Sequence, residues 1–260
     1  MVVYFTGTGN SKFAADVLAE KLEDECFSLN EAIKNSRSLK LQSEKPYVIV
    51  APIHAGCYPL IVVKNIKNAE FGGNKRVYFV STMGAPSKMG GGFYEKLALS
   101  KGLDFGGYCG VVMQNNFLPG DTMPEKTKAD EMLFDVFPEL EKIAEKIKSG
   151  KSITVNEGAK PDAFMAGLMG KLFGTFAGKF MKMKVDDRCD GCGICAEYCP
   201  VNNIELVSGK AVMKNKCVTC FSCINRCPPE AINVMGKTEK SGRFICPDYK
   251  EWKEKHSQRL

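Results

Sequence analysis

The sequence predicts an α/β domain with a doubly wound parallel sheet, followed by a small α+β domain that holds most of the cysteines. Residues 1–150 alternate short apolar runs with helical stretches, which is typical of a parallel sheet covered by helices on both faces. Residues 186–260 contain two similar runs with eight of the chain's twelve cysteines. Residues 151–185 differ from both and are predicted to be an apolar connecting segment.

The first domain is predicted to open with the strand VVYF and the helix SKFAADVLAEKL, and further strands follow as YVIVAP, RVYFVST and YCGVVMQ. A long helix, EKTKADEMLFDVFPELEKIAEKIKSG, completes it. Pro138 is expected to kink or divide this helix, because proline lacks the amide hydrogen that the helical ladder needs. Gly150 is expected to end it at a C-cap position, after a last turn rich in lysine.

The connecting segment contains the run AFMAGLMGKLFGTFAGKFMKMK, in which glycine and lysine interrupt the apolar residues. A membrane-spanning helix needs about 20 predominantly apolar residues with few charges, so this run is not predicted to cross a membrane. We interpret it as a helix that packs its apolar face between the two domains. The alternative is a basic amphipathic helix lying on a membrane surface, which we favour less.

The composition indicates a globular chain with reduced cysteines. With 260 residues, of which 44% are hydrophobic, the chain can bury a core without disulfide bonds. The N-terminus shows no secretory signal, so we expect a cytoplasmic protein. In a reducing compartment, clustered cysteines more often bind metal or perform redox chemistry than form disulfides.

The two cysteine runs, CDGCGICAEYCP and CVTCFSCINRCP, repeat with a period of 28 residues. Three cysteines spaced by three residues can wrap one corner of a four-iron cluster, while the fourth, followed by proline, reaches the other cluster. Gly191 and Gly193 leave room for backbone amides to approach the cluster sulfurs. The alternative is a pair of zinc sites, but structural zinc usually takes its ligands as two separated pairs. The predicted ligand sets are Cys189, Cys192, Cys195 and Cys227 for one 4Fe-4S cluster, and Cys217, Cys220, Cys223 and Cys199 for the other.

Residues 186–236 resemble bacterial-type ferredoxins with two 4Fe-4S clusters. The tails CPVNNIEL and CPPEAINV are similar to the CPxxAI ending of that family. Asn203 stands where the family commonly has alanine, which changes no ligand. Cys246 lies outside both runs and is predicted to be a buried or incidental cysteine.

A glycine-rich turn, TGTGNS, follows the first strand and opens the first helix. Amides and hydroxyls at a helix N-terminus bind phosphate, because they face the anion together with the positive end of the helix dipole. The turn lacks the lysine of the GxxxxGK nucleotide loop and the spacing of GxGxxG, which disfavours an ATPase and a dinucleotide fold. It resembles the FMN phosphate loop of flavodoxins, a likeness that covers residues 1–150 and implies a five-stranded flavodoxin-like sheet. The implied phosphate-binding residues are Thr6, Gly7, Thr8, Gly9, Asn10 and Ser11.

Flavodoxin-like sheets bind their ligand at the carboxyl ends of the strands, so residues 52–59 and 81–92 are the predicted flavin loops. The resemblance implies an aromatic ring from each loop against the flavin, with His54 or Tyr58 from the first and Phe93 or Tyr94 from the second. The alternative for His54 is a loop histidine without flavin contact. The predicted contacts are Pro52, Ile53, His54, Tyr58, Thr82, Met83, Gly84, Gly91 and Phe93.

Nearly the whole chain resembles a family of fused flavodoxin and ferredoxin proteins from anaerobes. This implies an electron carrier that passes single electrons between two clusters, FMN and a redox partner. The alternative is an FMN-dependent reductase of a small molecule, fed by its own ferredoxin domain; no catalytic residue is predicted, and the carrier is preferred over the enzyme. Cluster thiolates and the flavin phosphate would offset the formal charge of +6, so we expect no nucleic-acid partner. A membrane surface is a less expected partner, and a homo-oligomer stays open.

Overall fold

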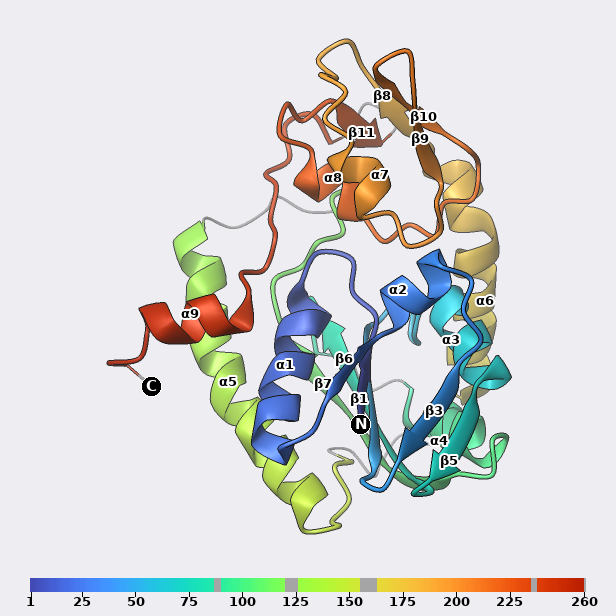
Figure 1. The fold of residues 1–260 in the computed structure, drawn as a ribbon, viewed down its shortest axis with the longest axis vertical. Coiled ribbons are helices and arrows are strands. Elements are labelled where there is room, and N and C mark those ends of the chain that lie inside the picture. Colours follow the sequence, from blue (N-terminus) through green and yellow to red (C-terminus); the bar gives the residue numbers. More distant parts are fainter. Residues whose placement is uncertain (87–89, 120–125, 155–162, 235–237, 260) are drawn as a thin grey trace.

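The computed structural model describes residues 1–86, 90–119, 126–154, 163–234 and 238–259. Figure 1 shows an α/β domain in the lower part of the view and a smaller cysteine-rich domain above it. Residues 87–89 of the second predicted flavin loop and residues 155–162 of the connecting segment lie outside the described residues.

The α/β domain is built on one parallel sheet of five strands. Counted within this sheet, the strand order is 2-1-3-4-5, which is compatible with a flavodoxin-like doubly wound fold. The three central strands are apolar and almost completely buried, as expected for strands that have helices on both faces. The strands, in spatial order, are β2 (Cys26–Ser28), β1 (Val2–Tyr4), β4 (Tyr47–Pro52), β6 (Arg76–Met83) and β7 (Asp104–Val112).

Two apolar cores lie on the two faces of this sheet. On one face are α1 (Asn10–Leu22) and α5 (Lys126–Lys148), and on the other are α2 (Leu29–Lys34), α3 (Leu60–Asn68) and α4 (Gly91–Leu99). A separate parallel pair consists of β3 (Lys40–Ser43) and β5 (Glu70–Gly73).

Pro138 lies inside α5 and does not divide it, which leaves the expected kink as a prediction. The helix ends as predicted at Gly150, which has a φ of 68°. The amides of Gly150 and Lys151 donate to the carbonyls of Ile147 and Lys146, the pattern of a glycine-terminated helix.

The cysteine-rich domain consists of two antiparallel strand pairs and two short helices. Strand β8 (Met183–Val185) pairs with β11 (Ile232–Val234), and β9 (Ile204–Val207) pairs with β10 (Lys210–Met213). Helices α7 (Ile194–Glu197) and α8 (Ser222–Arg226) contact each other and share an apolar core with these strands.

The chain returns to the α/β domain after the last cysteine run. Helix α9 (Tyr249–Lys255) packs Tyr249 and Trp252 edge-on against Phe13 of α1, with ring centroids 5.5 and 5.2 Å apart. Cys246 is buried in the same core and donates its amide hydrogen to the carbonyl of Thr8. The C-terminal extension therefore fastens the cysteine-rich domain back onto the α/β domain.

Helix α6 (Ala163–Phe180) runs along the outer side of α3 and α4, up to the cysteine-rich domain (Figure 1). It packs through its small residues. A Cβ atom built on Gly170 would lie 2.1 Å from the Cys57 sulfur, and one on Gly178 would lie 2.4 Å from the Cys217 carbonyl oxygen. The expectation that its apolar face is buried between the domains is wrong, because glycine brings the helix backbone against both domains and most of the bulky side chains point outward.

Candidate functional site

A cavity of about 340 Å³ lies at the carboxyl ends of the parallel strands, between the two domains. Its volume is in the usual range for a small-molecule or cofactor site. Most of the predicted site residues meet there. From the glycine-rich turn these are Thr6, Gly7, Thr8, Asn10 and Ser11, and from the strand-end loops Pro52, Ile53, His54, Thr82, Met83 and Gly84.

The glycine-rich turn presents the N-terminus of α1 to this cavity. The helix begins at Asn10, so the amides of its first turn have no carbonyl partner within the helix. Gly9 has a φ of 104° and lies behind the turn, where a Cβ atom would come within 2.8 Å of the Cys246 carbonyl oxygen. Thr6 Oγ1 accepts the Gly9 amide hydrogen at 3.0 Å, and Ser11 Oγ lies 2.7 Å from Thr82 Oγ1. Side-chain hydrogen bonds and the positive φ of Gly9 therefore fix the conformation of the turn.

Lys12, the only basic residue near the turn in the sequence, is engaged elsewhere. Its ammonium group lies 2.5 Å from a carboxylate oxygen of Asp16 and 3.1 Å from one of Asp248. Burial lowers the pKa of Lys12, but the hydrogen bonds and ion pairs with these two aspartates outweigh it and hold the pKa above its usual value. An anion at the turn would therefore bind to amides and hydroxyls rather than to a lysine.

Residues 114–117, which follow β7, form a cavity wall that the sequence analysis missed. Asn10 Nδ2 donates to the Gln114 carbonyl at 2.8 Å, and Asn116 Nδ2 donates to Thr8 Oγ1. The side-chain oxygens of Asn10 and Asn116 are buried and have no hydrogen-bond partner among the described residues. The sequence could have indicated this wall, because the run QNNF comes after the last strand of the sheet and so lies at the same edge as the other two loops.

His54 reaches the cavity from a tight turn. Its amide donates to the Cys57 carbonyl at 2.7 Å, and both residues between them, Ala55 and Gly56, have positive φ. His54 is half-buried, and the desolvation of its imidazole lowers the pKa to about 4. The ring lies edge-on to Phe173 of α6, with centroids 5.8 Å apart. At neutral pH, His54 is therefore an uncharged side chain in the cavity wall.

Three predicted flavin contacts are not among the residues that line the cavity, and their predicted role is corrected. Tyr58 is fully buried and donates its hydroxyl to the carbonyls of Ile49 and Val80, at 2.7 and 2.9 Å. Phe93 packs against Tyr94 and α6, and Gly91 is the first residue of α4. Apolar packing in the sheet-to-helix core accounts for the positions of Tyr58 and Phe93.

The fourth wall comes from the cysteine-rich domain. Thr219, Cys220 and Phe221 line the cavity, and Thr219 and Phe221 have φ values of 53° and 57°. Phe221 packs edge-on against Phe117, with centroids 5.5 Å apart. The Cys220 carbonyl lies so close to Gly7 that a Cβ atom there would be 2.1 Å from its oxygen. The second cysteine run and the glycine-rich turn are therefore in direct contact.

The eight cysteines of the two runs gather around two small hollows. Each hollow combines three cysteines of one run with the fourth of the other, which is the crossed grouping that the spacing predicts. Amides point at three of the sulfurs: Asn203 at Cys199, Thr219 at Cys217 and Ala231 at Cys227, at 3.2 to 3.3 Å. The first hollow is lined by Cys189, Cys192, Cys195 and Cys227, and the second by Cys199, Cys217, Cys220 and Cys223.

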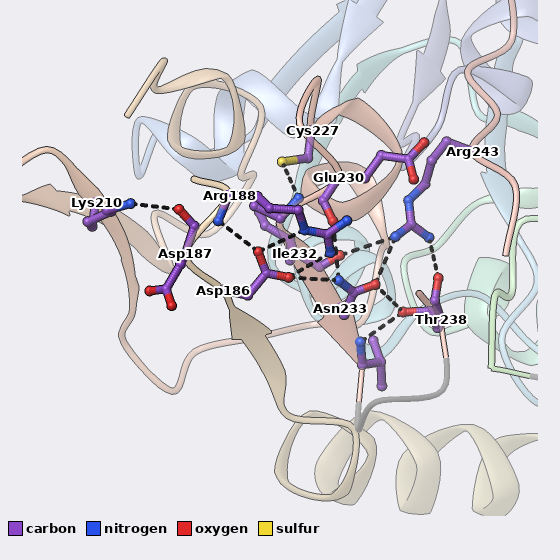
Figure 2. A network of polar contacts seen from close by, with 12 residues as sticks. Asp186, Asp187, Arg188, Lys210, Cys227, Glu230, Ile232, Asn233, Thr238 and Arg243 are labelled. Atoms are coloured by element: carbon purple, nitrogen blue, oxygen red, sulfur yellow. Dashed lines mark hydrogen bonds and ion pairs between the residues drawn. The ribbon is translucent and has the colours of Figure 1, made fainter. Parts of the chain in front are cut away.

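A polar network braces the first hollow (Figure 2). Arg243 donates to Asn233 Oδ1 at 2.9 Å and to the Thr238 carbonyl at 3.1 Å, and Thr238 Oγ1 donates to the same Asn233 oxygen at 3.0 Å. Asp186 accepts from the Arg188 guanidinium, which holds the pKa of that carboxyl at about 2. The network fixes the beginning of β11, which follows the loop whose amide points at Cys227.

Comparison with protein families identifies the second domain. Residues 181–228 match the family model of the 4Fe-4S dicluster domain. This segment contains all eight cysteines of the two runs, so the cysteine-rich domain is a ferredoxin-type iron-sulfur domain with 4Fe-4S clusters. A comparison with curated proteins gave no match for the chain. The family match covers the two cysteine runs and does not extend to residues 1–150 or to residues 229–260.

Proposed function

We propose that this protein is an electron carrier in which FMN, bound in the cavity, exchanges electrons with the two 4Fe-4S clusters and, through them, with a redox partner protein. The observation that carries this proposal is that the cavity and the second cysteine hollow have lining residues in common. Cys220 and Phe221 line the second cysteine hollow and the cavity at the same time. Two redox groups held on opposite sides of one loop are placed for direct electron exchange.

The cavity fits FMN in its donors and acceptors. The amides of the first turn of α1 and the hydroxyls of Thr6, Thr8 and Ser11 suit a phosphate, and the turn has the positive end of a helix dipole behind it. The buried, unpartnered oxygens of Asn10 and Asn116 suit the hydroxyl and N–H donors of a ribityl chain or flavin ring. When bound, FMN can take one or two electrons, whereas each cluster exchanges one at a time.

The two cysteine sites differ in exposure, which supports an order for the relay. In the first site Cys195 is buried and Cys192 is exposed, whereas in the second site Cys199 and Cys223 are both buried and no cysteine is exposed. Cys220 of the second site lines the cavity as well as its own hollow, so it lies between that site and the proposed flavin. We therefore assign the first site to contact with the redox partner and the second site to contact with the flavin.

The reductase alternative is less well supported. Catalysis on a small molecule at the flavin usually needs a group that donates or accepts a proton near the operating pH. Among the described lining residues, His54 is the candidate, and with a pKa of about 4 it is a poor proton donor at neutral pH. The lining otherwise offers amides, hydroxyls and apolar groups, which suit cofactor binding.

The proposal is tested by anaerobic purification followed by iron, sulfide and flavin analysis. We expect about eight iron and eight acid-labile sulfides, with one FMN, per chain. The double variant Thr8→Ala, Ser11→Ala should weaken FMN at least about a hundredfold while both clusters stay intact, because hydrogen bonds to a charged group are worth about 1.5–3 kcal/mol each.

The matched control is Ser81→Ala, which removes a buried hydroxyl bonded to Tyr94, outside the cavity lining. Its FMN affinity should equal that of the parent. Stoichiometric zinc without labile sulfide, or a double variant with parental FMN affinity, would contradict the proposal.

A further inference from the structure

Helix α6 carries the largest group of exposed apolar side chains in the described part of the chain. Of the thirteen large apolar residues that are exposed there, seven lie on this helix, and Phe164 and Phe180 at its two ends are 75% and 71% exposed. At 100° per residue these side chains fall on one side, opposite the glycines that pack against α3 and α4. The α6 apolar face consists of Phe164, Met165, Leu168, Met169, Leu172, Phe176 and Phe180.

The charges around this face are positive. Lys171, Lys179, Lys182 and Lys184 are all exposed, and residues 163–185 contain neither aspartate nor glutamate. The two helices that pack against α6 contribute three lysines and one glutamate. Lysine stems can lie along apolar surface while their ammonium groups reach toward anions.

We propose that the α6 apolar face binds the surface of a membrane that contains anionic phospholipids. Phenylalanine, leucine and methionine side chains would enter the boundary between headgroups and acyl chains, and the lysines would pair with the phosphate groups. With 18 residues, the helix is about 27 Å long, which gives an extended contact parallel to the surface. No helix among the described residues is long and apolar enough to cross a membrane, so α6 lies on the surface.

Charge complementarity selects lipid over a second copy of the chain. A symmetric dimer through this face would bring the lysines of two α6 helices together with no carboxylate on either helix to neutralise them. An anionic membrane supplies both the apolar interior and the negative charge. Phe173 lies at the edge of this face and lines the cavity, so α6 would connect the membrane contact with the wall of the proposed flavin site.

The test is flotation of the anaerobically purified holoprotein with two kinds of vesicle, one of phosphatidylcholine alone and one of equimolar phosphatidylglycerol and phosphatidylcholine. We expect binding to the anionic vesicles, weakened by high salt, and little binding to the neutral ones. The variant Lys171→Glu, Lys179→Glu should bind anionic vesicles at least about thirtyfold more weakly, since each lysine near such a surface contributes about 1 kcal/mol. The variant Phe164→Ser, Phe180→Ser should lose at least about tenfold.

The matched control is Val207→Ser, Val212→Ser, which removes two exposed apolar side chains from the β9–β10 pair and should bind like the parent. All four α6 substitutions are at exposed positions, so clusters and fold should be retained and can be checked by absorbance. Failure to bind anionic vesicles, or binding that the α6 variants leave unchanged, would overturn the proposal. A dimer that the Phe164→Ser, Phe180→Ser variant converts to monomer would instead assign the face to a second copy. None of these outcomes depends on FMN binding.

Discussion

Replacing Gly7 with alanine should loosen the contact between the glycine-rich turn and the second cysteine run. The new Cβ atom would lie 2.1 Å from the Cys220 carbonyl oxygen, whereas an ordinary contact begins at 3.4 Å. The two backbones must therefore separate by roughly 1 Å. This separation would disturb both segments, because the glycine-rich turn forms part of the cavity wall and the loop that contains Cys220 carries a predicted cluster ligand.

The magnitude follows from two opposing effects. Overpacking of this kind costs about 1–3 kcal/mol, while the loss of glycine flexibility in the unfolded chain returns about 0.4–1 kcal/mol. The central values leave a net destabilisation of about 1.3 kcal/mol, which corresponds to a fall of about 3–5 °C in the midpoint of thermal unfolding for a chain of this size. Electron exchange between flavin and cluster should also slow, since the separation between the two walls grows.

The assay is the loss of cluster and flavin absorbance on heating at one fixed scan rate, because unfolding of an iron-sulfur protein is expected to be irreversible. Gly91→Ala is the matched control. Gly91 is the first residue of α4, its φ is not positive, and a Cβ atom there meets nothing within 4 Å. That variant should unfold at the parental temperature or slightly above it. The reasoning is refuted if Gly7→Ala matches Gly91→Ala in both midpoint and transfer rate.

Three further outcomes are expected. Cys199→Ser should damage the cluster of the second hollow, which Cys217, Cys220 and Cys223 also line, and should leave the cluster of the first hollow intact. Iron content and electron paramagnetic resonance would measure this, and a loss confined to the cluster of the first hollow would contradict the crossed grouping. Burial holds the pKa of His54 at about 4 in the folded chain against 6.5 when unfolded, so the unfolded state binds the proton first as pH falls. Stability should therefore drop by about 1.4 kcal/mol between pH 7.5 and 5.5, measured as a lower midpoint of thermal unfolding at one fixed scan rate, and His54→Asn should remove this pH dependence. Arg243→Met removes a positive charge that interacts with Cys227, so the potential of the first cluster should become more negative in a redox titration, and an unchanged potential would count against this.

Short local motifs in the sequence predict most of the chemistry proposed for this protein. The spacing of the two cysteine runs predicts two clusters, and the family match to residues 181–228 agrees. The turn TGTGNS after an apolar strand predicts an anion site at the first helix, and the structure places that turn in the cavity wall. Both are short-range patterns in which residue type and spacing determine the geometry, because the chemistry needs particular side chains within a few residues of one another.

Tertiary packing decided which distant segments meet. Nothing near Tyr58 in the sequence distinguishes a cavity residue from a core residue, and burial with two carbonyl partners placed it in the core. Helix α6 has an apolar composition that suggests burial, but its glycines fit against Cys57 and Cys217, so the small side faces the protein and the bulky side faces outward. Cys220 likewise reaches the cavity wall through a contact with Gly7, a residue more than 200 positions away in the sequence. These outcomes depend on the shapes of surfaces far apart in the chain, which no local pattern encodes.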